Sequence, residues 1–340
     1  MHIKLKHLAI LEFIIIIILL AIFTIGHSGK NKIEKPQNSS ATKKQNYSGL
    51  LSPRIYSGIL EPKSMLIVNF EPLEENLRDY IKKNNIDASV YVENLRDGAS
   101  FGINEKKGFL PASLNKIPVA MLIMRRIEKG ELNFDTMIEI KESDKSDTFG
   151  SLYKTNEKHL PLRLLLEKML NESDNTAFNA LKNYIDQKDL NFFLNYLNYY
   201  NRDASILYSV NYNYSQNKNE LINTKSVYNI FSTLYLSTLL DTKDSEYILS
   251  LLTGTVFDIK KIANLPDDVI VAQKFGAEYT GNIKQFHSCG IMYINRSRIF
   301  YCIMTKDLEQ KDAVSAIDYT VRLIYKYIFD IRKELDTYKS

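Results

Sequence analysis

Tryptophan is absent from the 340-residue sequence, cysteine occurs only twice, and the five histidines do not cluster. These cysteines and histidines do not occur at the spacing of a zinc site, and we therefore expect neither a metal site nor a cofactor. The formal net charge is only +4, and no basic stretch is interleaved with aromatic residues, which argues against nucleic acid as a partner. What remains is an ordinary globular composition, 45% hydrophobic and 25% charged, long enough to bury a sizeable core.

The two cysteines, Cys289 and Cys302, flank a predicted hairpin with its tip at Asn295-Arg296. With that tip, the two residues lie directly opposite each other across the strands. The simpler interpretation is a pair of small buried side chains. The alternative is a disulfide, which would require an oxidising compartment outside the cytoplasm.

The N-terminus contains the longest apolar run, residues 8–25, interrupted only by Glu12. Its length just suffices to cross a hydrocarbon core. We expect a signal-anchor, with residues 1–7 in the cytoplasm and the rest of the chain outside the cell membrane; the alternative is a cleaved signal that releases a secreted protein. Residues 26–65 are polar, lack a hydrophobic period, and are expected to form a flexible linker.

The folded domain is expected over residues 66–340. An amphipathic helix with Leu73, Leu77 and Ile81 on one face is followed by two short strands and a helix that is apolar almost all round. Residues 160–240 have mostly helical patterns, and strands return near the C-terminus before a last helix. Strands at both ends predict an α+β fold, an α/β/α sandwich with one antiparallel sheet built from both ends of the domain and a separate all-helical lobe.

The first stretch with candidate catalytic residues is Ser113-Leu114-Asn115-Lys116, at the start of the apolar helix. Residues three apart on a helix lie on one face, so the Ser113 hydroxyl comes within reach of the Lys116 amine. A serine needs a base to become a nucleophile, and a lysine in a dry site can lose its proton near neutral pH. The ordinary alternative is a helix-capping serine beside a solvated lysine.

Two further stretches have polar residues in unusual places. Ser173-Asp174-Asn175 lies between two helical runs, where helix capping is the ordinary explanation. Lys274-Phe275-Gly276 lies on a predicted strand, where a lysine between apolar residues either faces a cleft or marks an edge strand.

Together the three stretches resemble the Ser-x-x-Lys, Ser-Asp-Asn and Lys-Thr-Gly motifs of class A β-lactamases and penicillin-binding proteins. They occur in that family's order, about 60 and about 100 residues apart, and the resemblance extends over residues 72 to 333. It implies a β-lactamase/transpeptidase-like fold. It also implies a serine hydrolase whose partner is a small-molecule β-lactam or a peptidoglycan stem peptide.

The resemblance implies a role for each residue. Ser113 would attack the carbonyl, Lys116 would accept its proton, and Ser173 would relay a proton to the leaving nitrogen. Asn175 would bind the amide side chain of the substrate, and Lys274 would attract its carboxylate.

The remaining expected substrate contacts lie close to these residues in the sequence or in the predicted sheet. Gly276 and Ala277 follow the lysine of the third motif, and the backbone N–H groups of Ser113 and Ala277 would form the oxyanion hole. Phe149 would form an aromatic wall. His287, on the next strand, is a candidate for substrate contact, with ordinary strand packing as the alternative.

The sequence departs from the family pattern in two places. Phe275 stands where the family has a hydroxyl that binds the substrate carboxylate. The glutamate that activates the deacylating water is expected near Tyr208, and the nearest acids are Asp203 and Glu220. We therefore keep three hypotheses: a class A-like β-lactamase, a penicillin-binding-protein-like peptidase that deacylates slowly, and a non-catalytic wall-binding or sensor domain.

Overall fold

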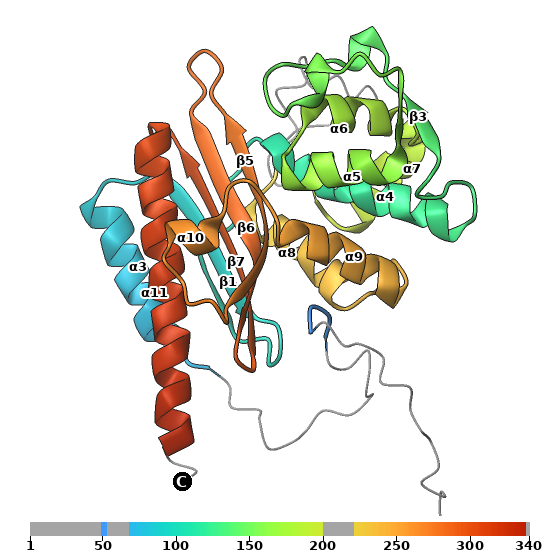
Figure 1. The fold of residues 1–340 in the computed structure, drawn as a ribbon. Helices are drawn as coiled ribbons and strands as arrows, with labels where there is room; N and C mark the ends of the chain where they lie inside the picture. The colour runs from blue at the N-terminus through green and yellow to red at the C-terminus, as the bar shows by residue number, and fades with distance from the viewer. Residues whose placement is uncertain (1–48, 53–67, 200–220, 338–340) are drawn as a thin grey trace, which may run out of the picture. The chain divides into compact units, whose positions relative to one another are not determined.

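A computed structural model describes residues 49–52, 68–199 and 221–337 of the chain (Figure 1). The expected cytoplasmic N-terminus, the membrane anchor at 8–25 and most of the linker lie outside these ranges, as do Asp203, Tyr208 and Glu220. Among the residues that are described, no helix is long and apolar enough to cross a membrane.

One five-stranded antiparallel sheet forms the centre of the folded part, in the order β2-β1-β7-β6-β5. Its strands are β1 (Ala88–Asn94), β2 (Ser100–Ile103), β5 (Ile270–Glu278), β6 (Gln285–Ile294) and β7 (Ser297–Lys306). β1 pairs with β7 along its whole length, so strands from both ends of the domain meet in the middle of the sheet. This confirms the α+β prediction and the predicted origin of the sheet.

Helices cover both faces of the sheet (Figure 1). On one face, α3 (Glu71–Lys83) and α11 (Gln310–Thr337) pack on an apolar layer, and α3 buries Leu73, Leu77 and Ile81 as the pattern predicts. On the other face lies the helical lobe with its own core. The lobe contains α4 (Lys116–Glu128), α5 (Leu162–Asn171), α6 (Asn175–Lys182), α7 (Gln187–Tyr196), α8 (Thr224–Tyr235) and α9 (Thr242–Leu252). Short elements complete the chain: η2 (Ala112–Asn115), η3 (Glu142–Asp144), η4 (Leu152–Lys154), β3 (Met137–Glu139), β4 (His159–Pro161) and α10 (Ile259–Ile262).

The β6–β7 hairpin turns at Asn295-Arg296, and Cys289 lies directly opposite Cys302. The structure joins the two cysteines in a disulfide, with 3.9 Å between their Cα atoms. The simpler interpretation, two unlinked buried side chains, is therefore wrong for this structure. Cys289 is also the direct neighbour of Lys274 on β5, so the disulfide lies next to the third motif.

Part of the expected linker is packed against the folded part. Leu50 and Leu51 are buried in the core of the helical lobe. Backbone hydrogen bonding supports this packing, because Ser52 N donates to Tyr235 O, and Tyr293 Oη donates to Leu50 O. The prediction of a flexible linker through residue 65 is therefore wrong at these two leucines, whose apolar side chains are removed from water.

Candidate active site

The first motif lies where η2 continues into α4, close to the edge of the sheet. Ser113 is half-buried, whereas Lys116 is buried at the first position of α4. Lys116 Nζ lies 2.7 Å from Ser113 Oγ, as the three-residue spacing predicts. Ala112 has a positive φ of 45°, so the backbone turns sharply just before the serine.

The other two motifs meet the same lysine. Lys116 Nζ donates to Asn175 Oδ1 at 2.6 Å and lies 3.3 Å from Ser173 Oγ. Lys274 Nζ donates to Ser173 Oγ at 2.8 Å. The structure thus brings Ser113, Lys116, Ser173, Asn175 and Lys274 into one hydrogen-bonded cluster.

Burial changes the protonation of the two amines. Burial lowers the pKa of Lys116 to about 7, although the nearby Asp174 carboxylate opposes this shift. Burial also lowers the pKa of Lys274 well below its ordinary value, and the positive charge of Lys116 lowers it further. Desolvation disfavours a charged amine, so the cluster contains a base that is partly neutral near pH 7.

The second motif is fixed by Asp174, which caps α6. Its Oδ1 accepts from Ala177 N at 2.9 Å, while Oδ2 accepts from Ser151 N and Leu152 N at 2.7 and 2.8 Å. Helix capping, the ordinary explanation for this stretch, therefore applies to Asp174. The same anchor aims the neighbouring Ser173 at the two lysines, so capping and site assembly are one arrangement.

In the third motif, side chains alternate between the two faces of β5. Lys274 reaches the cluster, and Gly276 passes close to the segment before Ser113, where an added Cβ would lie 3.2 Å from both Pro111 O and the Ala112 Cβ. Phe275 is only 4% exposed and packs in an aromatic group. Its neighbours in that group are Phe149, Phe257 and Phe286. The ring of Phe275 therefore extends the hydrophobic core at the position where the resemblance implies a hydroxyl.

The open side of the cluster is formed by a few partly exposed groups. Ser113, Asn175 and Ala277 are half-buried, and Phe149 is 40% exposed, with its ring centroid 5.4 Å from that of Phe275. The backbone of Phe149 touches the cluster, because Asn175 N donates to Phe149 O at 3.0 Å, and its role as an aromatic wall stays a prediction.

His287 is placed differently from the other candidates. Its side chain is fully buried, and Nε2 donates to Leu110 O at 2.9 Å. Burial lowers the pKa of the ring to about 4. This placement corresponds to the packing alternative and gives His287 no exposed surface for a substrate.

The motifs do not single out two residues that the structure places at the site. Thr148 Oγ1 accepts from Asn175 Nδ2 at 2.7 Å, and Gln285 Oε1 accepts from Leu110 N at 2.9 Å. Thr148 lies in a polar stretch and Gln285 at the start of a strand, and neither stands at a fixed spacing from a motif. The sequence therefore contains no signal that identifies them. A Gly-x-Ser-x-Gly string, Gly98 to Gly102, runs from a turn into β2 and forms a hairpin rather than a strand-to-helix elbow.

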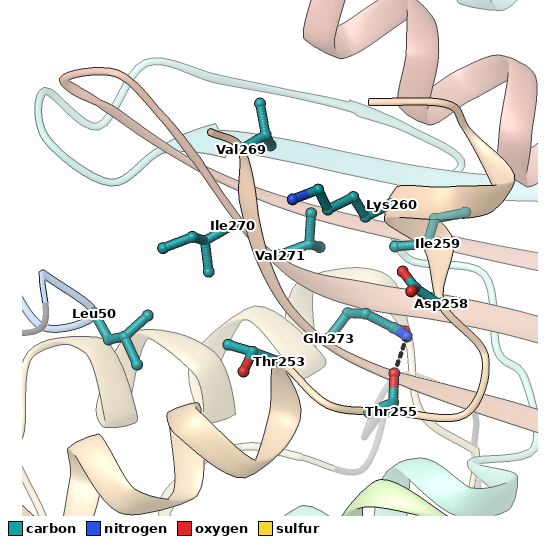
Figure 2. Close-up of a pocket in the computed structure, with 10 residues that line it drawn as sticks. All are labelled: Leu50, Thr253, Thr255, Asp258, Ile259, Lys260, Val269, Ile270, Val271 and Gln273. Carbon is teal, nitrogen blue, oxygen red and sulfur yellow. Dashed lines mark hydrogen bonds between the residues drawn. The ribbon is translucent and has the colours of Figure 1, made fainter. Parts of the chain in front are cut away.

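A cavity of about 420 Å³ lies away from the cluster, along the edge strand β5 (Figure 2). Leu50, Asp258 and Lys260 line it, together with the β5 residues before the third motif, and the motif residues do not. Gln273, one of its lining residues, donates a hydrogen bond to Thr255 Oγ1.

Within the described ranges, no group of three or more His, Cys, Asp or Glu side chains is arranged to hold a metal ion.

A family model described as the beta-lactamase enzyme family matches residues 72–328. The chain belongs to the beta-lactamase enzyme family. The Ser-x-x-Lys, Ser-Asp-Asn and Lys-Phe-Gly residues lie within the matched range and form the cluster described above.

Solved structures have the same fold as this beta-lactamase family member. PBP-A is 17% identical with a TM-score of 0.66, covering 76% of this chain and 97% of that chain. The TLA-3 extended-spectrum beta-lactamase is 17% identical with a TM-score of 0.67, covering 76% and 99%. A beta-lactamase from Chitinophaga pinensis is 16% identical with a TM-score of 0.65, covering 75% and 99%. At such identities the comparison establishes the fold alone.

A curated relative of this beta-lactamase family member is the beta-lactamase regulatory protein BlaB of Streptomyces cacaoi. The two are 30% identical over 119 residues, which are 34% of this chain and 38% of BlaB. The match thus spans well under half the length of that relative.

Proposed function

We propose that this beta-lactamase family member is a serine acyl-transfer enzyme of the class A type, in which Ser113 attacks the carbonyl of a β-lactam or of a D-alanyl-D-alanine-like peptide. The supporting observation is the 2.7 Å contact between Lys116 Nζ and Ser113 Oγ. Because burial lowers the pKa of Lys116 to about 7, a large fraction of this amine is neutral near pH 7 and can accept the serine proton.

The proton then has a short path to the leaving group. As the Ser113 Oγ–carbon bond forms and the carbon–nitrogen bond breaks, the leaving nitrogen needs one proton. Ser173 Oγ lies 3.3 Å from Lys116 Nζ and can pass its own proton to that nitrogen while taking one from Lys116. Lys274, at 2.8 Å, holds the Ser173 hydroxyl in place.

The developing negative charge is bound by backbone groups. Ser113 N–H and Ala277 N–H form the proposed oxyanion hole, where preorganised donors lower the barrier. Asn175 Nδ2 is the proposed donor to the substrate amide and must exchange its present acceptor, Thr148 Oγ1, for the substrate.

The fate of the acyl-enzyme separates two forms of the proposal. In the first, water hydrolyses the ester quickly and the protein acts as a β-lactamase. In the second, deacylation is slow, as in a penicillin-binding protein that acts on cell-wall peptides. Phe275 and the lack of a glutamate near Tyr208 in the sequence favour the second form. Among the described side chains, Lys116 Nζ is hydrogen-bonded to the hydroxyls of Ser113 and Ser173 and to the amide of Asn175. None of these three is a carboxylate that could activate a water for deacylation.

The test is a time course of intact mass after the full-length chain is mixed with benzylpenicillin. We expect an adduct of the drug's mass on the wild type and none on Ser113→Ala. As a control, Ser151→Ala, which removes an exposed hydroxyl bonded to Glu172, should acylate normally. Rapid loss of the adduct with opened drug indicates a β-lactamase, and a persistent adduct indicates the penicillin-binding form. An unmodified wild type beside drug that stays intact at high enzyme concentration contradicts acyl transfer.

A second candidate function is favoured by one comparison. The relative BlaB is named a regulatory protein, which suits a domain that binds β-lactams or wall fragments without turnover. For this candidate we expect saturable, non-covalent binding that Ser113→Ala leaves unchanged. Adduct formation on Ser113 would rule it out.

For location, we propose a single-pass anchor at residues 8–25 that holds the hydrolase domain outside the cell membrane. The apolar run supports it. Protease added to intact cells should then digest the domain, whereas protection until lysis would contradict this orientation.

A further inference from the structure

The backbone of Leu110, three residues before Ser113, is held by two side chains of β6. Gln285 Oε1 accepts from Leu110 N at 2.9 Å, and His287 Nε2 donates to Leu110 O at 2.9 Å. Gln285 and His287 are two residues apart on one strand, so their side chains point to the same face. Both are buried. We call this pair the Leu110 clamp.

The segment around Leu110 is fixed from other directions as well. Phe109 exchanges two backbone hydrogen bonds with Ile222, at 2.8 and 2.9 Å, and its ring meets the His287 ring edge-on at 5.7 Å. Gly276 leaves space for Pro111 and Ala112 to approach β5. The chain entering the nucleophile turn thus lies against the ends of both β5 and β6.

The same two strands determine where the Ala277 N–H points. The short Cα–Cα distance of 3.9 Å marks Cys289–Cys302 as a pair without backbone hydrogen bonds, so the N–H and C=O of Cys289 point toward β5. Its partner Lys274 therefore directs its backbone N–H toward β6. Backbone N–H groups point alternately to the two sides of a strand, so the N–H of Ala277, three residues later, points away from β6 at the edge of the sheet.

We infer that Gln285 and His287 are positioning residues, which set the separation between the Ser113 N–H and the Ala277 N–H by holding Leu110 against β6. The inference rests on the proposed acyl transfer. Ser113 follows directly from the clamped segment, while Ala277 lies between Gly276 and Glu278, the direct β5 partners of His287 and Gln285. One pair of side chains therefore ties together the two segments that supply the two N–H groups.

The chemistry of the clamp determines which substitutions are informative. A carbonyl oxygen only accepts, so His287 Nε2 must carry the proton, and burial keeps the ring neutral. His287→Phe keeps a ring of similar shape but removes the donor, whereas His287→Gln places an amide N–H near the position of Nε2. Gln285→Met keeps the length but removes the acceptor, whereas Gln285→Glu restores an oxygen.

The experiment measures acylation of the full-length chain by benzylpenicillin over a range of drug concentrations, which separates the affinity before reaction from the first-order acylation step. Because misplaced oxyanion donors act on the transition state, we expect His287→Phe and Gln285→Met to slow that step by about tenfold or more. The affinity before reaction should change by less than about threefold, and His287→Gln should recover most of the rate. Tyr293→Phe, which removes a buried hydrogen bond to Leu50 O farther along β6, is the matched control for lost stability.

Equal rates for wild type and both clamp variants would overturn the inference, as would an equal loss in Tyr293→Phe. If the wild type forms no adduct and leaves the drug intact, acyl transfer itself fails, and the amide NMR shifts of Ser113 and Ala277 then decide the question of positioning. Both shifts should move in His287→Phe and stay in Tyr293→Phe, and unmoved shifts would contradict the clamp. If His287→Phe does not fold, Gln285→Met provides the same test.

Discussion

The hydroxyl of Ser173 lies between two buried amines, 3.3 Å from Lys116 Nζ and 2.8 Å from Lys274 Nζ. Two ammonium groups so close together repel each other, and burial removes the water that would solvate them. Both effects lower the pKa of Lys274, and burial lowers that of Lys116 to about 7. At the scale of single residues, the site is therefore prepared to move a proton near neutral pH.

This arrangement predicts a pH dependence of acylation. Only the neutral amine of Lys116 accepts a proton, so the acylation rate constant should rise as the pH increases through about 7 and level off above it. Lys116→Arg keeps a permanent positive charge and should lower the rate roughly a hundredfold or more. Rates for both proteins between pH 5.5 and 9 check this, and a flat wild-type profile would count against Lys116 as the base.

Among the structural elements, the loop that ends in η4 depends on one glycine. Gly150 has a φ of 96°, and a Cβ there would lie 2.1 Å from Asp174 Oδ2, the oxygen that accepts from Ser151 N and Leu152 N. A side chain at this position would therefore displace the carboxylate that anchors the second motif.

We expect Gly150→Ala to destabilise the fold and to slow acylation, because Ser173 moves with Asp174. The matched control is Gly130→Ala, where φ is also positive, 72°, but nothing lies within 4 Å. Both variants incur backbone strain, so the extra loss in Gly150→Ala, about 2 kcal/mol of unfolding free energy, measures the clash with Asp174. Denaturant unfolding checks the difference, and equal losses would show that Asp174, whose Cα would also lie 2.5 Å from the added Cβ, can move aside without cost.

Hydrophobic pattern and motif spacing predict most of these elements from the sequence. The stripe on α3, the apolar character of α4 and the hairpin turn at Asn295-Arg296 depend on local periodicity and turn chemistry, and the structure confirms all three. The contacts of Gln285 and His287 with Leu110 depend on tertiary packing between segments about 175 residues apart, which no local pattern encodes.

For the molecule as a whole, the folded part begins earlier in the chain than composition suggests. Leu51 is fully buried in the core of the helical lobe, although it lies in a polar stretch rich in Lys, Asn and Ser. The pair Leu50-Leu51 is too short to show a hydrophobic period, so no local pattern distinguishes it from the linker around it.

Leu51→Ala should lower the unfolding free energy by roughly 2–5 kcal/mol, because it leaves a cavity in a packed core. Val256→Ala, at a side chain that is 58% exposed, is the control and should change stability little. Thermal and denaturant unfolding of both variants check this. Equal stability of Leu51→Ala and wild type would show that the segment is not held in the core.

The pairing of β1 with β7 joins residues more than 200 positions apart. During synthesis, β1 therefore cannot pair with β7 until more than 200 further residues have been made, and such long-range pairing is slow to form. Lys274 precedes β7 by only a short stretch, so premature termination anywhere before β7 yields a fragment whose sheet has no centre. The order of translation thus delays completion of the central sheet until β7 has been made.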